Sequence, residues 1–288
     1  MNDKKQRVRK RRIFINIMVP ALVLLAGLII LFIANRYNSN RSVLFRTEGS
    51  GVQICRNRKW QDFTLNGVNI GYGREKGSKD EYGRLIKQLA ARDINVICVN
   101  SVFPPDFYQA LFEYNLLTSR PLYLFQGICL GAETPGEHRN AFDDDLMSGF
   151  LDELRLTIDA VHGKGSGNYN LDNAPYVIGY NFFCDDSGMA AVTNEGNTDI
   201  LGFEGDYLYT ENASPYEAWL AAMGNFAIAY EQERYGGPYR LVSWISWTEL
   251  PQDLLAVNIG HISSTERYNA GIFTVRHLRE SSVNFEAL

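Results

Sequence analysis

The chain has 288 residues, of which 45% are hydrophobic and 12% aromatic, which is enough apolar material for a large core and excludes a mostly disordered chain. The net charge is −5, yet seven of the 28 basic residues lie within the first twelve positions. The remainder of the chain is therefore acidic, and we expect no general nucleic-acid surface.

The N-terminal part of the chain consists of a basic tail and an apolar stretch. Residues 1–12 hold the seven basic side chains, and residues 13–34 run for 22 positions without a charge. As a helix this stretch would span the ~30 Å hydrocarbon layer of a bilayer. A cleaved signal peptide has a shorter apolar region of roughly 7–15 residues and a small-residue cleavage site. We therefore expect a retained transmembrane helix, with cleavage as the alternative.

The distribution of positive charge predicts the orientation of that helix. The seven basic residues precede it, whereas Arg36 and Arg41 follow it. By the positive-inside rule the N-terminus then lies in the cytoplasm. We expect a single-pass protein of the cell membrane whose C-terminal domain is extracellular.

Residues 35–60 are polar and mixed in character, which indicates either a stalk or a lead-in hairpin before a domain at 61–288. From Phe63 onward, apolar strand-like runs alternate with helix-like ones, and the runs begin near residues 63, 94, 121, 175, 239 and 270. Apolar strands joined by helices predict a parallel sheet. Ser214, Pro215 and Glu217 predict a helix start with a capping box.

This alternation predicts an α/β fold of the (β/α)₈ TIM-barrel type. A closed barrel needs eight strands, and about six are visible, so we expect an incomplete barrel. Neither the cysteines nor the histidines have metal-ligand spacing, so we expect no metal and no cofactor. The cysteines are read as small buried hydrophobes, with a disulfide as the alternative. They are Cys55, Cys98, Cys129 and Cys184, and the histidines are His138, His162, His261 and His277.

Several stretches together resemble one family. They are FTLNGVNIGYG, PPDFYQALFEYN with RPLYLFQGICLGAE, TENASPYEAWLAAM and AIAYEQERYGGPYRLVSW. They are similar to the TIM-barrel module of glycoside hydrolase family 2-like proteins, in particular a membrane-attached bacterial group with the barrel outside the cell. The resemblance covers roughly Trp60 to His277 and implies glycan as the ligand.

The resemblance also implies a place for the acid/base carboxylate, at the end of the fourth strand. Aligned on Gly179 and Tyr180, that position falls on Asp185. Its side chain is one methylene shorter than that of Glu, and a shift of about 1 Å can cost on the order of 10²-fold in rate. We therefore expect weakened or lost catalysis. The alternative is that Asp185 belongs to a solvated turn with Asp186.

The other expected sugar-binding positions depart from the family pattern. The second strand carries Asn100, and the fifth has Ser243 before Trp244. Aromatic side chains remain as candidate platforms for sugar rings, with core packing as the alternative. Glu133 is a further candidate at the rim, although such a residue is more often an ordinary surface carboxylate. The aromatic candidates are Tyr180, Trp244 and Trp247.

At the C-terminus, relatives continue into a seventh strand that carries the nucleophile, whereas this chain reads RHLRESSVNFEAL. The expectation is a truncated product or a chain completed by a membrane-protein partner. We therefore expect a membrane-anchored, glycoside-hydrolase-like barrel that acts on or binds glycan. The alternative is a non-catalytic carbohydrate-binding or assembly module of a polysaccharide-related membrane system.

Overall fold

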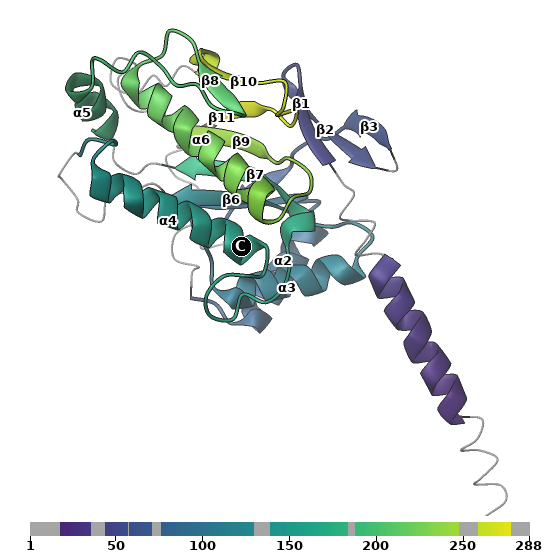
Figure 1. Ribbon diagram of the computed structural model, residues 1–288. Coiled ribbons are helices and arrows are strands. Elements are labelled where there is room, and N and C mark those ends of the chain that lie inside the picture. Colours follow the sequence, from purple (N-terminus) through teal and green to yellow (C-terminus); the bar gives the residue numbers. More distant parts are fainter. Residues whose placement is uncertain are drawn as a thin grey trace, which may run out of the picture. The chain divides into compact units, whose positions relative to one another are not determined.

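A parallel β-sheet organises the larger part of the chain (Figure 1). The computed structural model describes residues 18–35, 44–56, 58–70, 76–129, 139–183, 188–247 and 259–277. At residues 183, 245–247, 259 and 274–277 it describes the backbone alone. The chain divides into two units, Met1–Ser42 and Val43–Leu288.

The first unit contains one apolar helix, Met18–Asn35, with a mean hydropathy of 2.5 and none of its window buried. Eighteen residues at about 1.5 Å each give a length close to the hydrocarbon thickness of a bilayer. The helix is long and apolar enough to cross a membrane, and a signal sequence meets the same criteria. Residues 13–17 of the predicted span lie outside the described residues.

Six strands form the main sheet of the second unit, in the order β11-β9-β7-β6-β5-β4, and every neighbouring pair is parallel. The predicted parallel sheet of six strands is therefore confirmed. Among the described residues β4 and β11 are not paired with each other, and closure into a barrel stays a prediction. The strands are β4 Gly67–Asn69, β5 Val96–Val99, β6 Tyr123–Cys129, β7 Val177–Phe183, β9 Leu241–Trp247 and β11 Ile272–His277.

Helices cover one face of this sheet, and α4 and α6 lie side by side there (Figure 1). At Gly224 of α6 an added Cβ would lie 3.2 Å from the Trp244 ring, so the small residue lets this helix approach β9 closely. The predicted capping box is confirmed, because Glu217 N donates to Ser214 Oγ over 3.3 Å and Ser214 N donates to Glu217 Oε2 over 2.8 Å. The helices are α2 Lys79–Ala91, α3 Pro105–Leu117, α4 Asp144–Val161, α5 Met189–Gly196 and α6 Pro215–Arg234, with 3₁₀ turns at Ala174–Tyr176 and Ile259–His261.

The opposite face of the sheet is concave. The rings of Phe125 on β6 and Phe273 on β11 lie 5.5 Å apart between centroids. These strands are separated by β7 and β9, so in a flat sheet their backbones would stand about 14 Å apart. The sheet therefore curves until the side chains of its two arms meet. We call this concave side the inner face.

A three-stranded antiparallel meander covers the amino-terminal end of the inner face. It consists of β1 Leu44–Glu48, β2 Gly51–Arg56 and β3 Lys59–Asp62. Phe45 packs edge-on against Tyr123, at the start of β6, with 5.0 Å between ring centroids. Of residues 35–60, expected to be a stalk or lead-in hairpin, Leu44–Glu48, Gly51–Arg56 and the start of β3 thus form strands within the second unit.

A second, smaller sheet packs on α6. It pairs β8 Leu208–Thr210 with β10 Ile262–Ser264 in antiparallel fashion. The side chain of Asn225 on α6 accepts hydrogen bonds from the backbone amides of Tyr207 and Leu208, over 2.9 and 3.2 Å. This contact fixes the small sheet to α6.

Candidate functional site

The carboxyl ends of the parallel strands meet at one edge of the sheet, where sites of α/β proteins form. Asn69 ends β4 and Asn100 follows β5, and Asn69 Nδ2 donates to Asn100 Oδ1 over 2.8 Å. Both residues lie on the inner face, because the register pairs Asn69 with Cys98 and side chains alternate along a strand. Two amides thus stand together at this edge.

The position of Asn100 depends on a glycine in the neighbouring strand. A Cβ added to Gly127 would collide with the backbone oxygen of Val99, and it would lie 2.6 Å from the Cα of Asn100. The chain leaving β5 therefore passes directly over Gly127 on the inner face. Only a residue without a side chain permits this approach.

A second polar pair lies on β7 and β9. Ser243 Oγ on β9 donates to Asn181 Oδ1 on β7 over 2.7 Å, and the two residues are direct partners in the ladder. Both are buried, with relative exposures of 0% and 9%. The hydrogen bond orients the Asn181 amide within an otherwise apolar strand.

Two thiols share the inner face with these amides. Cys98 stands on β5 and Cys129 ends β6, and the described cysteines Cys55, Cys98 and Cys129 form no disulfide. Burial raises the pKa of Cys98 to about 11, so this thiol is neutral at physiological pH. Cys98 thus acts as a small, half-buried side chain of the inner face. Cys184 lies outside the described residues.

The predicted catalytic residue cannot be placed. Asp185 follows the end of β7 in the chain and, like Glu133, lies outside the described residues. Trp247 ends β9, and its backbone alone is described. Of the predicted site residues, Asn100 is the one whose described side chain lies at the carboxyl edge of the inner face. The functional roles of all six predicted site residues stay predictions.

Tyr180 and Trp244 occupy the other face of the sheet. Tyr180 is buried and its hydroxyl donates to Glu231 on α6 over 3.0 Å. Trp244 is 2% exposed and packs against Phe182 at 6.1 Å between ring centroids. A platform for a sugar ring must offer one face of its ring to solvent. The placement therefore favours core packing, the alternative that the sequence left open.

A buried ionic cluster lies on the same helix-covered side, near the start of β9. Glu231 Oε1 accepts from Arg240 Nε over 2.7 Å and lies 2.8 Å from His162 Nε2. The His162 ring in turn stacks on Tyr235, with 3.9 Å between centroids. Burial by itself would raise the pKa of Glu231, but Arg240 and His162 outweigh it and lower that pKa. The amino-terminal side of a parallel sheet usually serves stability.

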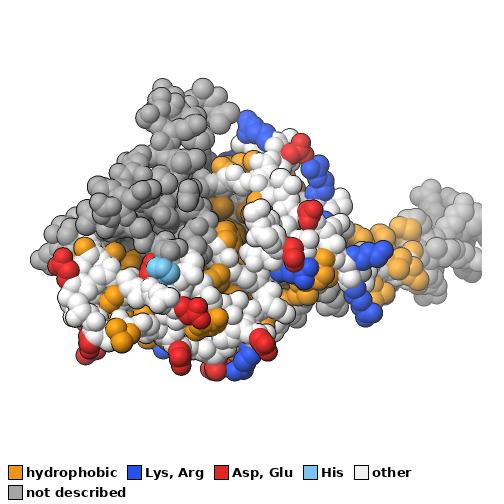
Figure 2. All heavy atoms as spheres, turned by 90° about the horizontal axis from the view of Figure 1, so that it is seen from above, with side chains coloured by type: hydrophobic (Ala, Val, Ile, Leu, Met, Phe, Trp, Pro, Cys, Tyr) orange, Lys and Arg blue, Asp and Glu red, His pale blue; other side chains and the backbone are white. Residues whose placement is uncertain are grey.

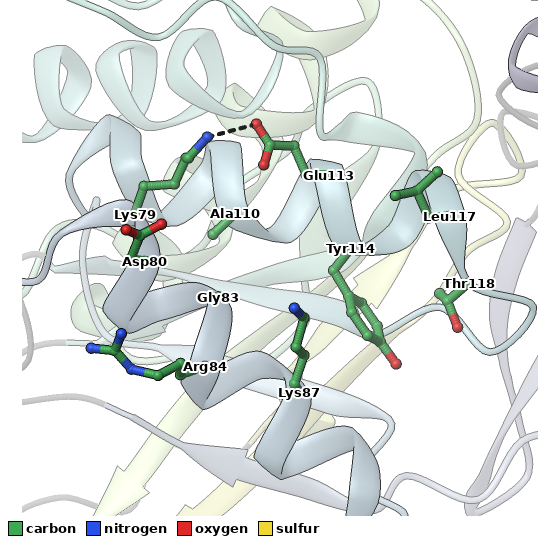
Figure 3. A pocket seen from close by; sticks show the side chains of 10 residues that line it. All are labelled: Lys79, Asp80, Gly83, Arg84, Lys87, Ala110, Glu113, Tyr114, Leu117 and Thr118. Carbon is green, nitrogen blue, oxygen red and sulfur yellow. Dashed lines mark hydrogen bonds and ion pairs between the residues drawn. The ribbon is translucent and has the colours of Figure 1, made fainter.

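A hollow of about 560 Å³ opens between α2 and α3 (Figure 3). The ion pair of Lys79 with Glu113, 3.1 Å long, lies along it, and Lys87 and Tyr114 project from opposite helices. None of the predicted site residues lines this hollow. On the face seen in Figure 2, acidic and basic side chains are interspersed. The carboxyl edge of the inner face is therefore the better candidate site.

The described residues contain no group of three or more His, Cys, Asp or Glu side chains that could hold a metal ion. The two histidines whose side chains are described, His162 and His261, each pair with a carboxylate. His261 Nδ1 lies 2.8 Å from Glu217 Oε2, the carboxylate of the capping box, and His162 belongs to the ionic cluster. Each pair ties α6 to a neighbouring segment.

Sequence reasoning missed two of the amides at the site. Asn69 ends a three-residue strand, which is too short to show a periodicity. Asn181 did carry a signal, because it is a polar residue in the apolar run YVIGYNFF. A buried polar side chain needs a partner, so its position alone could have predicted a contact on the adjoining strand.

No protein-family model matches the chain, and no curated protein sequence matches it. Among solved structures it is weakly similar to the exo-chitosanase CsxA of Amycolatopsis orientalis, with a TM-score of 0.31 and 13% identity over 55% of this chain and 18% of that one. A structure from a study of the inhibition of the exo-β-D-glucosaminidase CsxA by a glucosamine-configured castanospermine has a TM-score of 0.33 and 14% identity, over 55% of this chain and 17% of that one. A complex of the exo-chitosanase with PNP-β-D-glucosamine has a TM-score of 0.32 and 13% identity, over 54% of this chain and 18% of that one.

The aligned part is thus about a fifth of each of these chains. The solved structures to which this chain is weakly similar are those of a glycosidase. TM-scores near 0.3 are too low to establish a shared fold, and we base no argument on them.

Proposed function

We propose that this protein is a membrane-anchored, glycoside-hydrolase-like barrel whose extracellular domain binds or acts on a glycan. The observation that carries the proposal is the set of polar side chains on the inner face, with Asn69 and Asn100 paired at its carboxyl edge and Asn181 and Ser243 paired within β7 and β9 beneath that edge. The apolar helix Met18–Asn35 would supply the anchor.

Amide and hydroxyl groups suit the recognition of sugars. A sugar hydroxyl both donates and accepts hydrogen bonds, and an Asn side chain offers two donors and one acceptor at a fixed spacing. Side chains held by their own hydrogen bonds lose little freedom when a ligand binds. The pairs Asn69–Asn100 and Asn181–Ser243 have this property.

Catalysis would depend on Asp185 as the acid/base residue, as the family resemblance implies. The described strand side chains of the inner face include amides, a hydroxyl and thiols. Such groups suit the binding of a glycan, whereas bond cleavage would need carboxylates, for which Asp185 is the candidate. A non-catalytic carbohydrate-binding or assembly module is therefore the second candidate function.

The binding test uses the full-length protein in detergent micelles and a panel of cell-envelope and exported polysaccharides. We expect at least one glycan to bind, and Asn69→Ala to weaken it about five- to tenfold, the value of a lost hydrogen bond. Asn66→Ala is the matched control, because Asn66 lies at the opposite end of the same strand. No binding across the panel, or equal losses for both variants, would refute glycan recognition at this edge.

The catalytic test uses aryl glycosides with the same preparation. An enzyme should show turnover that Asp185→Ala abolishes while glycan binding is retained. Binding without turnover would establish the non-catalytic module instead.

A further inference from the structure

The turn between β2 and β3 concentrates positive charge. Residues 56–60 read Arg-Asn-Arg-Lys-Trp, and the side chains of Arg56, Arg58 and Lys59 are exposed. Arg56 donates to the Tyr123 hydroxyl over 2.8 Å, a neutral partner. Among the described residues, no carboxylate forms an ion pair with any of the three cations. We call residues 56–60 the basic turn.

Arg58 holds an unusual backbone conformation for its residue type. Its φ is 62°, in the left-handed region where Gly or Asn would fit without strain. The chain therefore places a long cationic side chain where a small residue would be the more stable choice. This backbone outlier leads to the hypothesis that the Arg58 side chain has a function.

Trp60 follows Lys59 on β3 and is 38% exposed, and its ring lies on the face of the meander opposite to the Lys59 side chain, because side chains alternate along a strand. The Arg46 guanidinium lies 4.3 Å from the centroid of its ring, and Glu48 pairs with Arg46 over 3.1 Å. The ring is thus held in place while part of it stays open to solvent. A partly exposed Trp next to several cations is typical of segments that lie in the headgroup region of a bilayer.

We propose that the basic turn docks on an anionic lipid surface. The cations would meet lipid phosphates, and Trp60 would enter the interfacial layer. The proposal rests on the membrane anchor of the proposed function but not on glycan binding. Eight residues, 36–43, separate the apolar helix from β1, so the anchor would keep a bilayer at high effective concentration near the turn.

The test uses the full-length chain in nanodiscs of phosphatidylcholine, with or without phosphatidylglycerol, and with brominated lipid as a quencher of Trp fluorescence. The difference between the native protein and Trp60→Phe isolates the signal of Trp60, because the other three Trp residues are present in both proteins. We expect quenching of Trp60 in the anionic discs. It should weaken in phosphatidylcholine and at high salt.

The charge variant is Arg58→Gly with Lys59→Gln, in which the glycine also relieves the strained φ. Each cation contributes about fivefold to binding at an anionic surface, so the docked fraction relative to the undocked one should fall about 30-fold. The matched control is Arg84→Gln with Lys87→Gln, which removes the same charge from the exposed side of α2. The control should leave the quenching unchanged.

Several outcomes would overturn the proposal. They are equal quenching in both lipids, no quenching of Trp60, or equal effects of the two variant pairs. A chain that fails to stay in the discs would refute the membrane anchor. Docking of the basic turn is then tested by flotation with vesicles, and binding that does not depend on phosphatidylglycerol would count against docking. If an acidic polysaccharide, but not lipid, reduced the accessibility of Trp60 to solvent, the basic turn would be assigned to a polysaccharide partner instead.

Discussion

Arg240 Nε lies 2.7 Å from Glu231 Oε1, and the two side chains are 8% and 3% exposed. This ion pair joins the segment before β9 to α6. Arg240 also donates to the backbone oxygen of Val177 at the start of β7, over 2.7 Å. The pair thus connects two neighbouring strands and the helix that covers them. Its removal should therefore destabilise the helix-covered side of the sheet.

Replacing Glu231 by Gln should destabilise the protein strongly. The substitution leaves Arg240 as a buried charge without its carboxylate, and breaking such pairs costs about 3–5 kcal/mol. Denaturant unfolding of the full-length protein in detergent measures the change. Glu233→Gln is the matched control, since Glu233 is exposed two positions further along the same helix, and it should change stability by less than about 0.5 kcal/mol. A similar loss for both variants would contradict this role of Glu231.

The same carboxylate should make stability depend on acid pH. Although burial opposes it, the field of Arg240 and His162 lowers the pKa of Glu231 in the folded protein. The ionised form therefore stabilises the fold above the unfolded-state pKa of about 4.3, and this stabilisation is lost as the pH falls through the lowered folded-state pKa. The difference in unfolding free energy between native protein and Glu231→Gln should have its largest value near neutral pH and should decrease below about pH 4. A difference that grew in acid would show the opposite sign of shift.

Gly127→Ala should damage both the fold and the candidate site. The new methyl group would meet the backbone of Val99 and Asn100, which cannot move without breaking β5. We expect a loss of about 2–3 kcal/mol or more, together with weaker glycan binding. Gly149→Ala is the contrasting change, because Gly149 lies inside α4 with nothing within 4 Å of an added Cβ, and it should stabilise by about 0.5–1 kcal/mol. Thermal unfolding measures both variants. Midpoints that shifted in the same direction would contradict the close packing at Gly127.

Ser214→Ala should weaken the start of α6. The hydroxyl accepts from Glu217 N over 3.3 Å, and the loss of such a cap costs about 1 kcal/mol. Ser119→Ala, at an exposed loop position, should leave the unfolding midpoint nearly unchanged. Equal midpoints for the two variants would show that the capping box adds nothing to the stability of this helix.

The parallel sheet and the start of α6 could be predicted from the sequence because their signals are local. Apolar runs separated by helical periodicity define strands and crossovers within about thirty residues. The Ser214–Glu217 capping box is written in four consecutive positions. For residues 35–60 the sequence left a stalk and a lead-in hairpin open, because the meander gains its core contact from Phe45 and Tyr123, which lie far apart in the chain.

The candidate site was predicted less completely than the fold. Asn100 was expected at the carboxyl edge, where it pairs with Asn69. Tyr180 and Trp244 were expected either to stack on sugars or to pack in the core. A strand that is apolar on both faces does not reveal which face its aromatic side chains take. The register with β9 and the contact with α6 decided this.

The sequence by itself determined the apolar N-terminal helix, the order of strands and helices, and the cap of α6, since each depends on side chains close together in the chain. Tertiary structure alone decided which polar groups meet. Asn181 and Ser243 are 62 positions apart and become neighbours because their strands pair in one register, and Glu231 receives Arg240 because α6 turns back onto the sheet. A shift of one residue in either strand would turn such side chains to the other face, so the curvature and register of the whole sheet fix the chemistry of its edge.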